Sequence, residues 1–260
     1  MRLQTFVVGA ILALAIFLFA QRKQTPAERP LLKSAIDLTH ALNESTPGYT
    51  PDEKLHARHV AAYEKEGYFA RRISLFEHFG THVDAPAHFA DGTWTIDQVP
   101  ADRLVRPLIV IDVSSRVKDN AGYFVSLDDI AAWEEKNGRI PPGAVVMVRT
   151  GWDERWNSPE RYRNADQNGV MHFPSYSADA AKFLVEGREI VGLGIDTLSV
   201  DAGSDSNYPV HRYCSRHDIY HIENVANLAQ VPPIGALVVI APMKLQGGSG
   251  APARVLALLR

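Results

Sequence analysis

Pro107-Leu-Ile-Val-Ile-Asp-Val113 is an almost entirely apolar run whose length suits a buried strand. It is followed by Ser126-Leu-Asp-Asp129, a helix start in which Ser126 can cap the first turn and Asp129 completes a capping box. Ala144-Val-Val-Met-Val-Arg149 is a second buried run of strand length. A strand, a helix and a strand in this order predict an α/β fold.

The same alternation continues toward the C-terminus. Ser177 begins a second capped helix, which we expect to end with Gly187 as its C-cap. The apolar runs Ile190–Ile195 and Ala236–Ala241 are two further strands. These elements extend the α/β pattern over the second half of the chain.

The segments upstream are more varied. Ala35–His40 alternates like a short strand, Thr46–Pro51 is a turn-rich loop, and Arg72–Phe79 favours an extended conformation. Ala57–Gly67 has helical spacing with few apolar anchors, which predicts a surface helix. The β-rich segments that lie outside the alternation suggest a second, more mixed sheet.

Composition limits the possible functions. The chain has 260 residues, of which 46% are hydrophobic and 22% charged, so it can bury a sizeable core. Its formal net charge of −3 argues against a nucleic-acid partner, because phosphate binding requires a basic face. The single cysteine, Cys214, excludes an intramolecular disulfide and a thiolate-rich zinc cluster. A bound metal must therefore take histidine and carboxylate ligands.

Residues 1–30 look separate from the domain that follows. Their apolar run, Phe6–Ala20, fits the core of a signal peptide better than a membrane-spanning helix, which needs about 20 residues. We therefore predict an exported, periplasmic protein that is either cleaved or tethered to the membrane through residues 6–20. Arg22 and Lys23 leave open a cytoplasmic-facing anchor. Residues 31–260 form the predicted single domain.

Glu77-His-Phe-Gly-Thr-His-Val-Asp-Ala-Pro-Ala-His-Phe89 carries an unusual density of ligand-type side chains. His82, Asp84 and His88 follow His78 by four, six and ten residues. Even offsets place side chains on one face of an extended backbone, whereas a helix would scatter them. Glycine, proline and β-branched residues within the run also disfavour helix. The four side chains therefore converge if this stretch is extended or irregular.

Imidazole and carboxylate groups suit zinc or manganese. A bound divalent ion lowers the pKa of its water toward about 7 and polarises a carbonyl group, which are the two requirements of a hydrolase. His88, which lies beyond the bend at Pro86, can serve as the general base. The simpler interpretation is that these are ordinary polar residues on a sheet face, but four ligand-type residues in phase favour a metal site.

A second polar cluster lies at Val210–Asn224. In one interpretation, His217 and His221 form a helical two-histidine zinc pattern, although the glutamate that this pattern requires is absent. In the other, His211 and Glu223 complete the site that begins at His78. Spacing alone does not choose between them.

The run from His78 to His88 reads His-x-Gly-Thr-His-x-Asp-Ala-Pro-x-His and resembles the signature of the cyclase family of metal-dependent hydrolases. That family includes bacterial kynurenine formamidase and isatin hydrolase. The resemblance runs from about Ile36 to the C-terminus. Further matching segments are Gly194–Asp201, Tyr208–Arg212, Ile222–Leu228 and Gly247–Arg254. It implies an α/β swivelling β/β/α-type domain, with a mixed sheet flanked by helices, that forms a homodimer or homotetramer.

The resemblance also implies a ligand set. His78, His82 and Asp84 would hold one metal, and Asp84 and Glu223 would bridge to a second metal that His211 also binds. The spacing of His211 and Glu223 is the family's, which selects the second interpretation of the downstream cluster.

Other residues receive roles by the same resemblance. His88 would be the catalytic acid–base residue, and His217 and His221 become packing or rim residues. Tyr49 stands where formamidases carry a substrate-contacting tryptophan, so it is the expected substrate-binding residue. Tyr213–His217 departs from the family's usual sequence, which leaves the pocket wall, and with it the substrate, open.

A few residues near the motifs have two interpretations each. Asp196 and Asp201 either orient a ligand histidine or cap a turn. Aromatic residues around the motif fill the core by default, and the alternative is that one or two of them line an aryl-binding pocket. They are Phe69, Phe76, Phe79, Phe89 and Trp94.

The predicted function is a metal-dependent hydrolase that opens a carbon–nitrogen amide bond of an aryl formamide or a cyclic amide. It would hold one or two zinc or manganese ions per chain and act on a small molecule. One alternative is a single-manganese isatin-hydrolase-like enzyme or a lactone hydrolase. The alternative from another class is an exported, metal-dependent binding protein without turnover.

Overall fold

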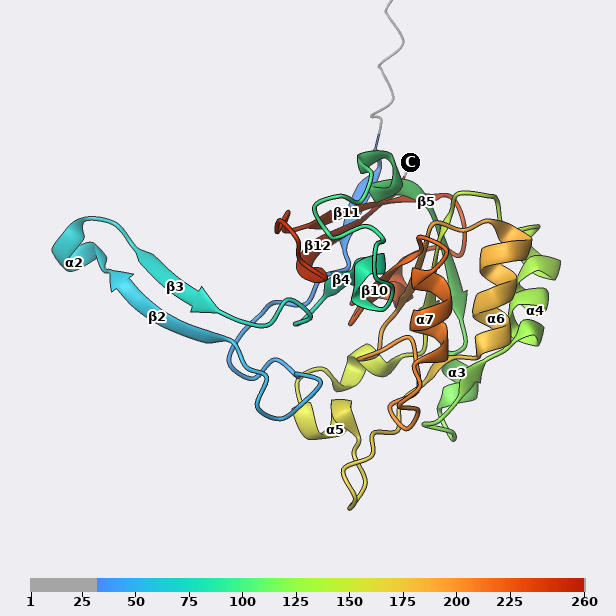
Figure 1. The fold of residues 1–260 in the computed structure, drawn as a ribbon, viewed down its shortest axis with the longest axis horizontal. Helices are drawn as coiled ribbons and strands as arrows, with labels where there is room; N and C mark the ends of the chain where they lie inside the picture. The colour runs from blue at the N-terminus through green and yellow to red at the C-terminus, as the bar shows by residue number, and fades with distance from the viewer. Residues whose placement is uncertain (1–31, 260) are drawn as a thin grey trace, which may run out of the picture. The chain divides into compact units, whose positions relative to one another are not determined.

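The computed structural model describes residues 32–259 (Figure 1). The predicted signal peptide or anchor, including the tether at residues 6–20, lies outside the described residues. Within residues 32–259, no helix combines the length and the apolar character that crossing a bilayer requires.

Four parallel strands form the centre of an eight-stranded mixed sheet in the described part of the chain. They are β5 (Val105–Asp112), β7 (Val145–Arg149), β9 (Gly192–Ile195) and β10 (Tyr220–Glu223). The strands predicted at residues 107–113, 144–149 and 190–195 are therefore confirmed within a few residues. Their nearly continuous apolar sequences fit strands that are buried on both faces.

The remaining four strands are antiparallel to their neighbours. They are β1 (Ser34–Asp37), β4 (His82–Asp84), β11 (Ala236–Pro242) and β12 (Gly250–Leu259). The start of β12 pairs with β4, and its remainder pairs with β11, so β12 closes the sheet into a barrel-like form. Of the β-rich segments outside the alternation, Ala35–His40 joins this same sheet as β1, whereas Arg72–Phe79 contributes to β3 (Ala70–Ser74), which pairs with β2 (His56–Ala61) in a two-stranded sheet. The second sheet suggested by the sequence is therefore this two-stranded antiparallel one rather than a larger mixed sheet. The predicted α/β class with a mixed sheet and flanking helices is confirmed.

Helices pack on the outer face of the parallel strands. They are α4 (Leu127–Asn137), α6 (Ala178–Lys182) and α7 (Pro209–Ser215) (Figure 1). The predicted capping box at α4 is present, since Ser126 accepts from the Asp129 amide and Asp129 accepts from the Ser126 amide. The second helix begins after Ser177 as predicted, but it continues into a π-helical turn, η4 (Phe183–Gly187). Gly187 is therefore not a C-cap, because it lies inside this turn.

Two hydrophobic cores lie on opposite faces of the sheet. Along β7, Val146 and Val148 pack with the helices, whereas Val145 and Met147 point into the barrel-like interior. The interior is narrow at Gly194, where a Cβ atom would lie 2.8 Å from Met147 Cγ. This alternation follows directly from the two-residue period of a strand.

The surface helix predicted at Ala57–Gly67 was wrong. The segment forms β2 (His56–Ala61), the short helix α2 (Tyr63–Glu66) and a turn at Gly67, after which β3 (Ala70–Ser74) pairs back on β2. The cross-strand hydrogen bonds outweigh weak helical spacing that has no apolar face to bury. The extended prediction for Arg72–Phe79 holds only as far as Ser74.

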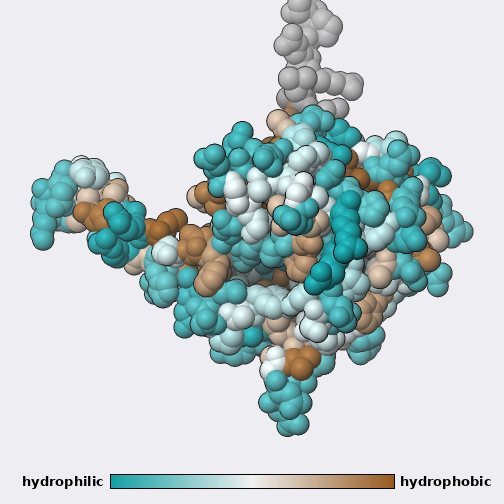
Figure 2. All heavy atoms as spheres, in the orientation of Figure 1, coloured by the Kyte–Doolittle hydropathy of each residue, from teal (hydrophilic) through white to brown (hydrophobic). Residues whose placement is uncertain are grey.

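We call residues 56–74 the arm. It extends away from the sheet, and brown, apolar atoms gather on it (Figures 1 and 2). Its exposed apolar side chains are Val60, Tyr63, Tyr68, Phe69 and Ile73.

The other short elements of the described chain are α3 (Ser114–Val117), α5 (Pro159–Arg163), β6 (Phe124–Val125), β8 (Ser175–Tyr176), η1 (Pro86–His88), η2 (Ala101–Leu104), η3 (Trp152–Arg155) and η5 (Leu228–Gln230).

Candidate metal centre

Strands β4 and β10 place four ligand-type side chains on one face of the sheet. The two strands are antiparallel neighbours, with His82 opposite Glu223 and Asp84 opposite His221. Residues two apart on a strand point to the same side, so all four side chains share that side. All are buried, with exposed fractions of 4% or less.

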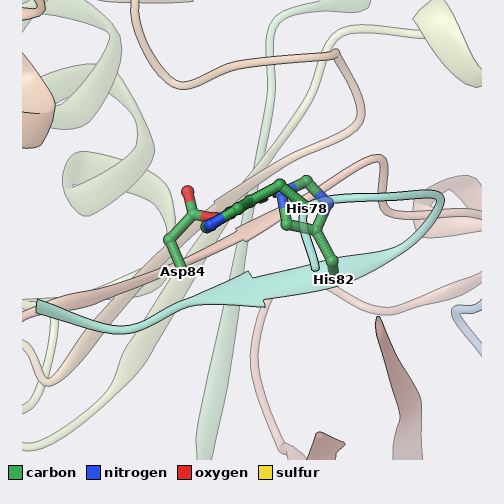
Figure 3. A group of neighbouring side chains, drawn as sticks. All are labelled: His78, His82 and Asp84. Carbon is green, nitrogen blue, oxygen red and sulfur yellow. Dashed lines mark hydrogen bonds and ion pairs between the residues drawn. The ribbon is translucent and has the colours of Figure 1, made fainter. Parts of the chain in front are cut away.

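His78 joins this group from the bend that precedes β4. Its Nδ1 lies 2.5 Å from Asp84 Oδ1, and His82 Nε2 lies 3.1 Å from the same oxygen. The three side chains point toward one another (Figure 3). The structure thus brings together the three residues predicted to hold the first metal.

His211 approaches from helix α7, on the other side of Asp84. Its Nε2 lies 3.2 Å from Asp84 Oδ2 and 3.3 Å from Glu223 Oε1. The second oxygen of Glu223 lies 3.5 Å from His82 Nε2. Each carboxylate therefore directs one oxygen toward His82 and the other toward His211, as a pair of bridging ligands would.

The helical two-histidine zinc pattern does not form. His221 lies on strand β10, and the exposed His217 hydrogen-bonds through Nδ1 to the Tyr213 carbonyl oxygen at 2.8 Å. The structure instead places His211 and Glu223 together with His78, His82 and Asp84.

The sequence interpretation made His221 a packing or rim residue, and the structure places it in the buried interior rather than at the rim. It is only 1% exposed, and its Nδ1 lies 3.9 Å from Asp84 Oδ2. Burial, together with the nearby His211, lowers the pKa of His221 to about 3, so the ring is neutral. The sequence contained a pattern that predicts this position. His221 and Glu223 are two residues apart, as His82 and Asp84 are, so on a strand they share one face.

Hydrogen bonds orient two of the histidines. Asp201 Oδ2 accepts from His211 Nδ1 at 2.7 Å, and the same carboxylate caps the start of α7 by accepting the backbone amides of Val210 and His211. His82 Nδ1 donates to the Gly80 carbonyl oxygen at 2.9 Å. Because Nδ1 is the donor in both rings, Nε2 is the nitrogen that faces the carboxylates and that the neutral ring would offer to a metal. Asp196, in contrast, accepts from Thr150 and Gly151 and makes no hydrogen bond or ion pair with a ligand histidine in the described chain.

His78 is oriented by Ser249, which lies 171 residues further along the chain. His78 Nε2 donates to Ser249 Oγ at 2.8 Å, and this hydroxyl donates to Glu77 Oε2 at 3.0 Å. Gly250 allows the close approach, since a Cβ atom there would lie 2.5 Å from His78 Cε1. The chain Glu77–Ser249–His78 therefore leaves Nδ1 free to bind a metal. The turn before β12 thus supports a ligand histidine.

Replacing Ser249 with alanine will weaken metal binding, because His78 loses the hydrogen bond that fixes its tautomer. We expect the metal dissociation constant to rise about 10- to 100-fold, as for other hydrogen-bond partners of metal ligands. Competition with a chromogenic chelator measures this change. The matched control is Ser115→Ala, at an exposed serine on α3, which should bind metal like the unmodified protein. Equal affinities for the two variants would contradict the role of Ser249.

The buried carboxylates of the cluster favour a bound cation. Burial lowers the pKa of His82, but the charge of Asp84 outweighs it and raises the pKa to about 9. Burial likewise works against His211, yet its contacts with Asp201, Asp84 and Glu223 raise its pKa well above the usual value. Among the described residues, no lysine or arginine pairs with Asp84 or Glu223. Buried nitrogen and oxygen donors without a permanent cationic partner fit a divalent ion.

The cluster lies in a pocket of about 470 Å³. Aromatic side chains line it beside the ligand residues, namely Tyr49, Phe76, Phe89 and Tyr208. Two of the aromatic residues singled out from the sequence are thus in the wall. Of the rest, Phe79 is in the core, Trp94 packs against Arg103, and Phe69 lies on the arm.

His88 faces the same pocket. Its ring stacks on His78 with 3.9 Å between centroids, and Phe89 meets its edge. This desolvation lowers the pKa of His88 to about 4, so the ring is neutral and can accept a proton.

Cys214 is buried, and burial raises the pKa of its thiol, so it is no nucleophile.

The chain is similar to known proteins over most of its length. The Cyclase family model matches residues 36–202. Isatin hydrolase from Roseibium aggregatum is 33% identical over 243 residues, which cover 86% of this chain and 91% of the relative. Kynurenine formamidase from Polaromonas naphthalenivorans is 30% identical over 204 residues, covering 75% and 81%. The structure of isatin hydrolase A from Ralstonia solanacearum superposes with a TM-score of 0.82 at 33% identity, covering 87% and 92%.

Proposed function

The chain belongs to the cyclase family of metal-dependent hydrolases, and from this premise we propose that it hydrolyses a carbon–nitrogen amide bond in a cyclic aryl amide or an aryl formamide. The observation that carries the proposal is a buried cluster of histidines and carboxylates at the base of an aromatic-lined pocket. The names of the relatives, isatin hydrolase and kynurenine formamidase, supply the two bond types.

The cofactor we propose is zinc or manganese, bound at two positions. His78, His82 and Asp84 would form the first position, and Asp84, Glu223 and His211 the second. A bound divalent ion supplies an acidified water and polarises the amide carbonyl. The opposite directions of the two oxygens in Asp84 and Glu223 support two positions over one.

His88 would move the proton. Its neutral ring faces the pocket next to His78, where it can take a proton from the attacking water and return it to the leaving nitrogen. The aromatic ring of the substrate would pack against Phe76 and Phe89, with Tyr49 on the same wall. These apolar contacts would also exclude bulk water from the reaction.

The test is a substrate panel. Protein freed of metal with a chelator and then reloaded with zinc or manganese is assayed on isatin, N-formyl arylamines and aryl lactones. We expect turnover of at least one amide, loss of turnover in the chelated protein, and two metal equivalents by elemental analysis. Turnover of lactones alone would replace the amide proposal. Tight binding of these compounds without turnover under either metal would establish the metal-dependent binding protein instead.

We also propose that two copies associate through the arm. Five of its apolar side chains are exposed and gather on one hairpin, and exposed apolar patches mark surfaces of protein–protein interaction (Figure 2). The arm leads through Phe76 directly to the pocket wall, so a second copy would cover an edge of the site. Light scattering should give the mass of a dimer or tetramer, and Tyr63→Lys should lower it. A monomer at all protein concentrations would contradict this proposal.

For residues 1–30 we propose a role in export, with a periplasmic or membrane-tethered product. Cell fractionation, protease accessibility in spheroplasts and the mass of the recovered protein test it. A protected domain that remains on the membrane would support the cytoplasmic-facing anchor.

A further inference from the structure

No hydrogen bond to another described residue explains why a histidine is buried at position 221. Neither ring nitrogen hydrogen-bonds to another described residue, and Nε2 is completely buried. A buried imidazole without partners is unfavourable, and an apolar residue would fill the same space more stably. Ile222, the next residue on β10, is likewise buried, but it points into the hydrophobic core. The histidine therefore stands where packing alone would favour an aliphatic side chain.

The register of β10 directs His221 toward the second metal position. It lies opposite Asp84 and on the same face as Glu223. One ligand atom from each of Asp84, His211 and His221 lies within 4.8 Å of the other two. The rings of His211 and His221 are 4.6 Å apart at their centroids. The two imidazoles thus converge on the Asp84 oxygen that faces away from His78 and His82.

The spacing of the donor atoms fits coordination. Ligands bound to zinc at about 2.0 to 2.2 Å in a tetrahedron lie roughly 3.3 Å from one another. Around Asp84 Oδ2 the distances are 3.2 Å to His211 Nε2 and 3.9 Å to His221 Nδ1. From His211 Nε2 to Glu223 Oε1 the distance is 3.3 Å. Only a small movement of His221 is needed to complete the set.

We propose that His221 Nδ1 is a protein ligand of the second metal, which completes a four-ligand position with Asp84, His211 and Glu223. This inference rests on the proposed two-metal function. The positions would then differ in kind, because a site with four protein ligands is closed, whereas three ligands leave a place for water or substrate. Asp84, His211 and Glu223 line the pocket together with His78 and His82, whereas His221 lies behind it. The three-ligand first position would therefore be the open, reacting one, and the fourth ligand, His221, would close the second position and hold its ion more permanently.

The first experiment compares metal binding in His221→Gln with that in the unmodified protein. We expect the unmodified protein to bind two zinc ions. In the variant, one ion should remain at similar affinity, and the second should bind at least 10-fold more weakly in chelator competition. His172→Gln, at an exposed histidine paired with Asp166, is the matched control and should bind both ions normally. Unchanged affinity for both ions in His221→Gln would overturn the proposal.

A second experiment needs no variant, so it stands even if His221→Gln does not fold. A crystal structure of the zinc-loaded protein, with anomalous data at the zinc edge, should place an ion about 2.1 Å from His221 Nδ1. An ion bound by His211 but more than about 3 Å from that nitrogen would overturn the proposal, since such a distance exceeds any zinc–nitrogen bond. The proposed function is judged separately by turnover of the amide panel, so an active enzyme with unligated His221 would reject this inference alone.

Discussion

Asp84→Asn should abolish catalysis and remove the metal. Its two oxygens point to different histidine groups, Oδ1 to His78 and His82 and Oδ2 to His211, so one carboxylate serves both metal positions. The amide keeps the size of the side chain but loses its charge, and it replaces one lone-pair oxygen with a hydrogen-bond donor. Since a metal supplies several kcal/mol of transition-state stabilisation, we expect kcat/KM to fall by at least about a thousandfold.

Elemental analysis and steady-state kinetics on the same preparation measure both effects of Asp84→Asn. Metal content should fall below one equivalent per chain. Asp112→Asn is the matched control, because Asp112 is a half-exposed carboxylate that pairs with Arg149 away from the pocket lining. An Asp84→Asn protein that keeps two ions and full turnover would show that the cluster is not the metal centre.

His88→Ala should reduce catalysis with the metal in place. The ring stacks on His78 and faces the pocket, but no oxygen of Asp84 or Glu223 is within ion-pair distance of it in the described chain. Loss of a general acid–base group lowers kcat by about 10²- to 10⁴-fold. We expect a fall in that range, a much smaller change in KM, and unchanged metal content.

Added imidazole provides a check on His88→Ala, because a small base can enter the space that the ring leaves and restore part of the rate. His172→Ala is the matched control at an exposed histidine and should retain full activity. If His88→Ala loses metal together with activity, His88 is a ligand rather than the proton carrier. If kcat is unchanged, another group moves the proton.

The α/β class followed from local features of the sequence. The apolar runs of β5, β7 and β9 and the capping box at Ser126 each depend on neighbours within a few residues, so pattern and propensity were sufficient. The arm was missed for the opposite reason. Hydrogen bonds between β2 and β3 stabilise it, and weak helical spacing at Ala57–Gly67 gave no sign of that pairing.

The residues of the candidate site likewise fall into those predicted from local sequence and those placed by long-range pairing. The sequence by itself indicated which donors belong to the site, because His82 and Asp84 are two residues apart and share one face of β4. The bend at Gly80, whose φ is 67°, brings His78 to them. The tertiary structure decided what faces them. The register of β10 against β4 brings His221 opposite Asp84, and the turn before β12 brings Ser249 to His78 from 171 residues away. Such contacts depend on strand order and long-range register, which a short stretch of sequence does not encode.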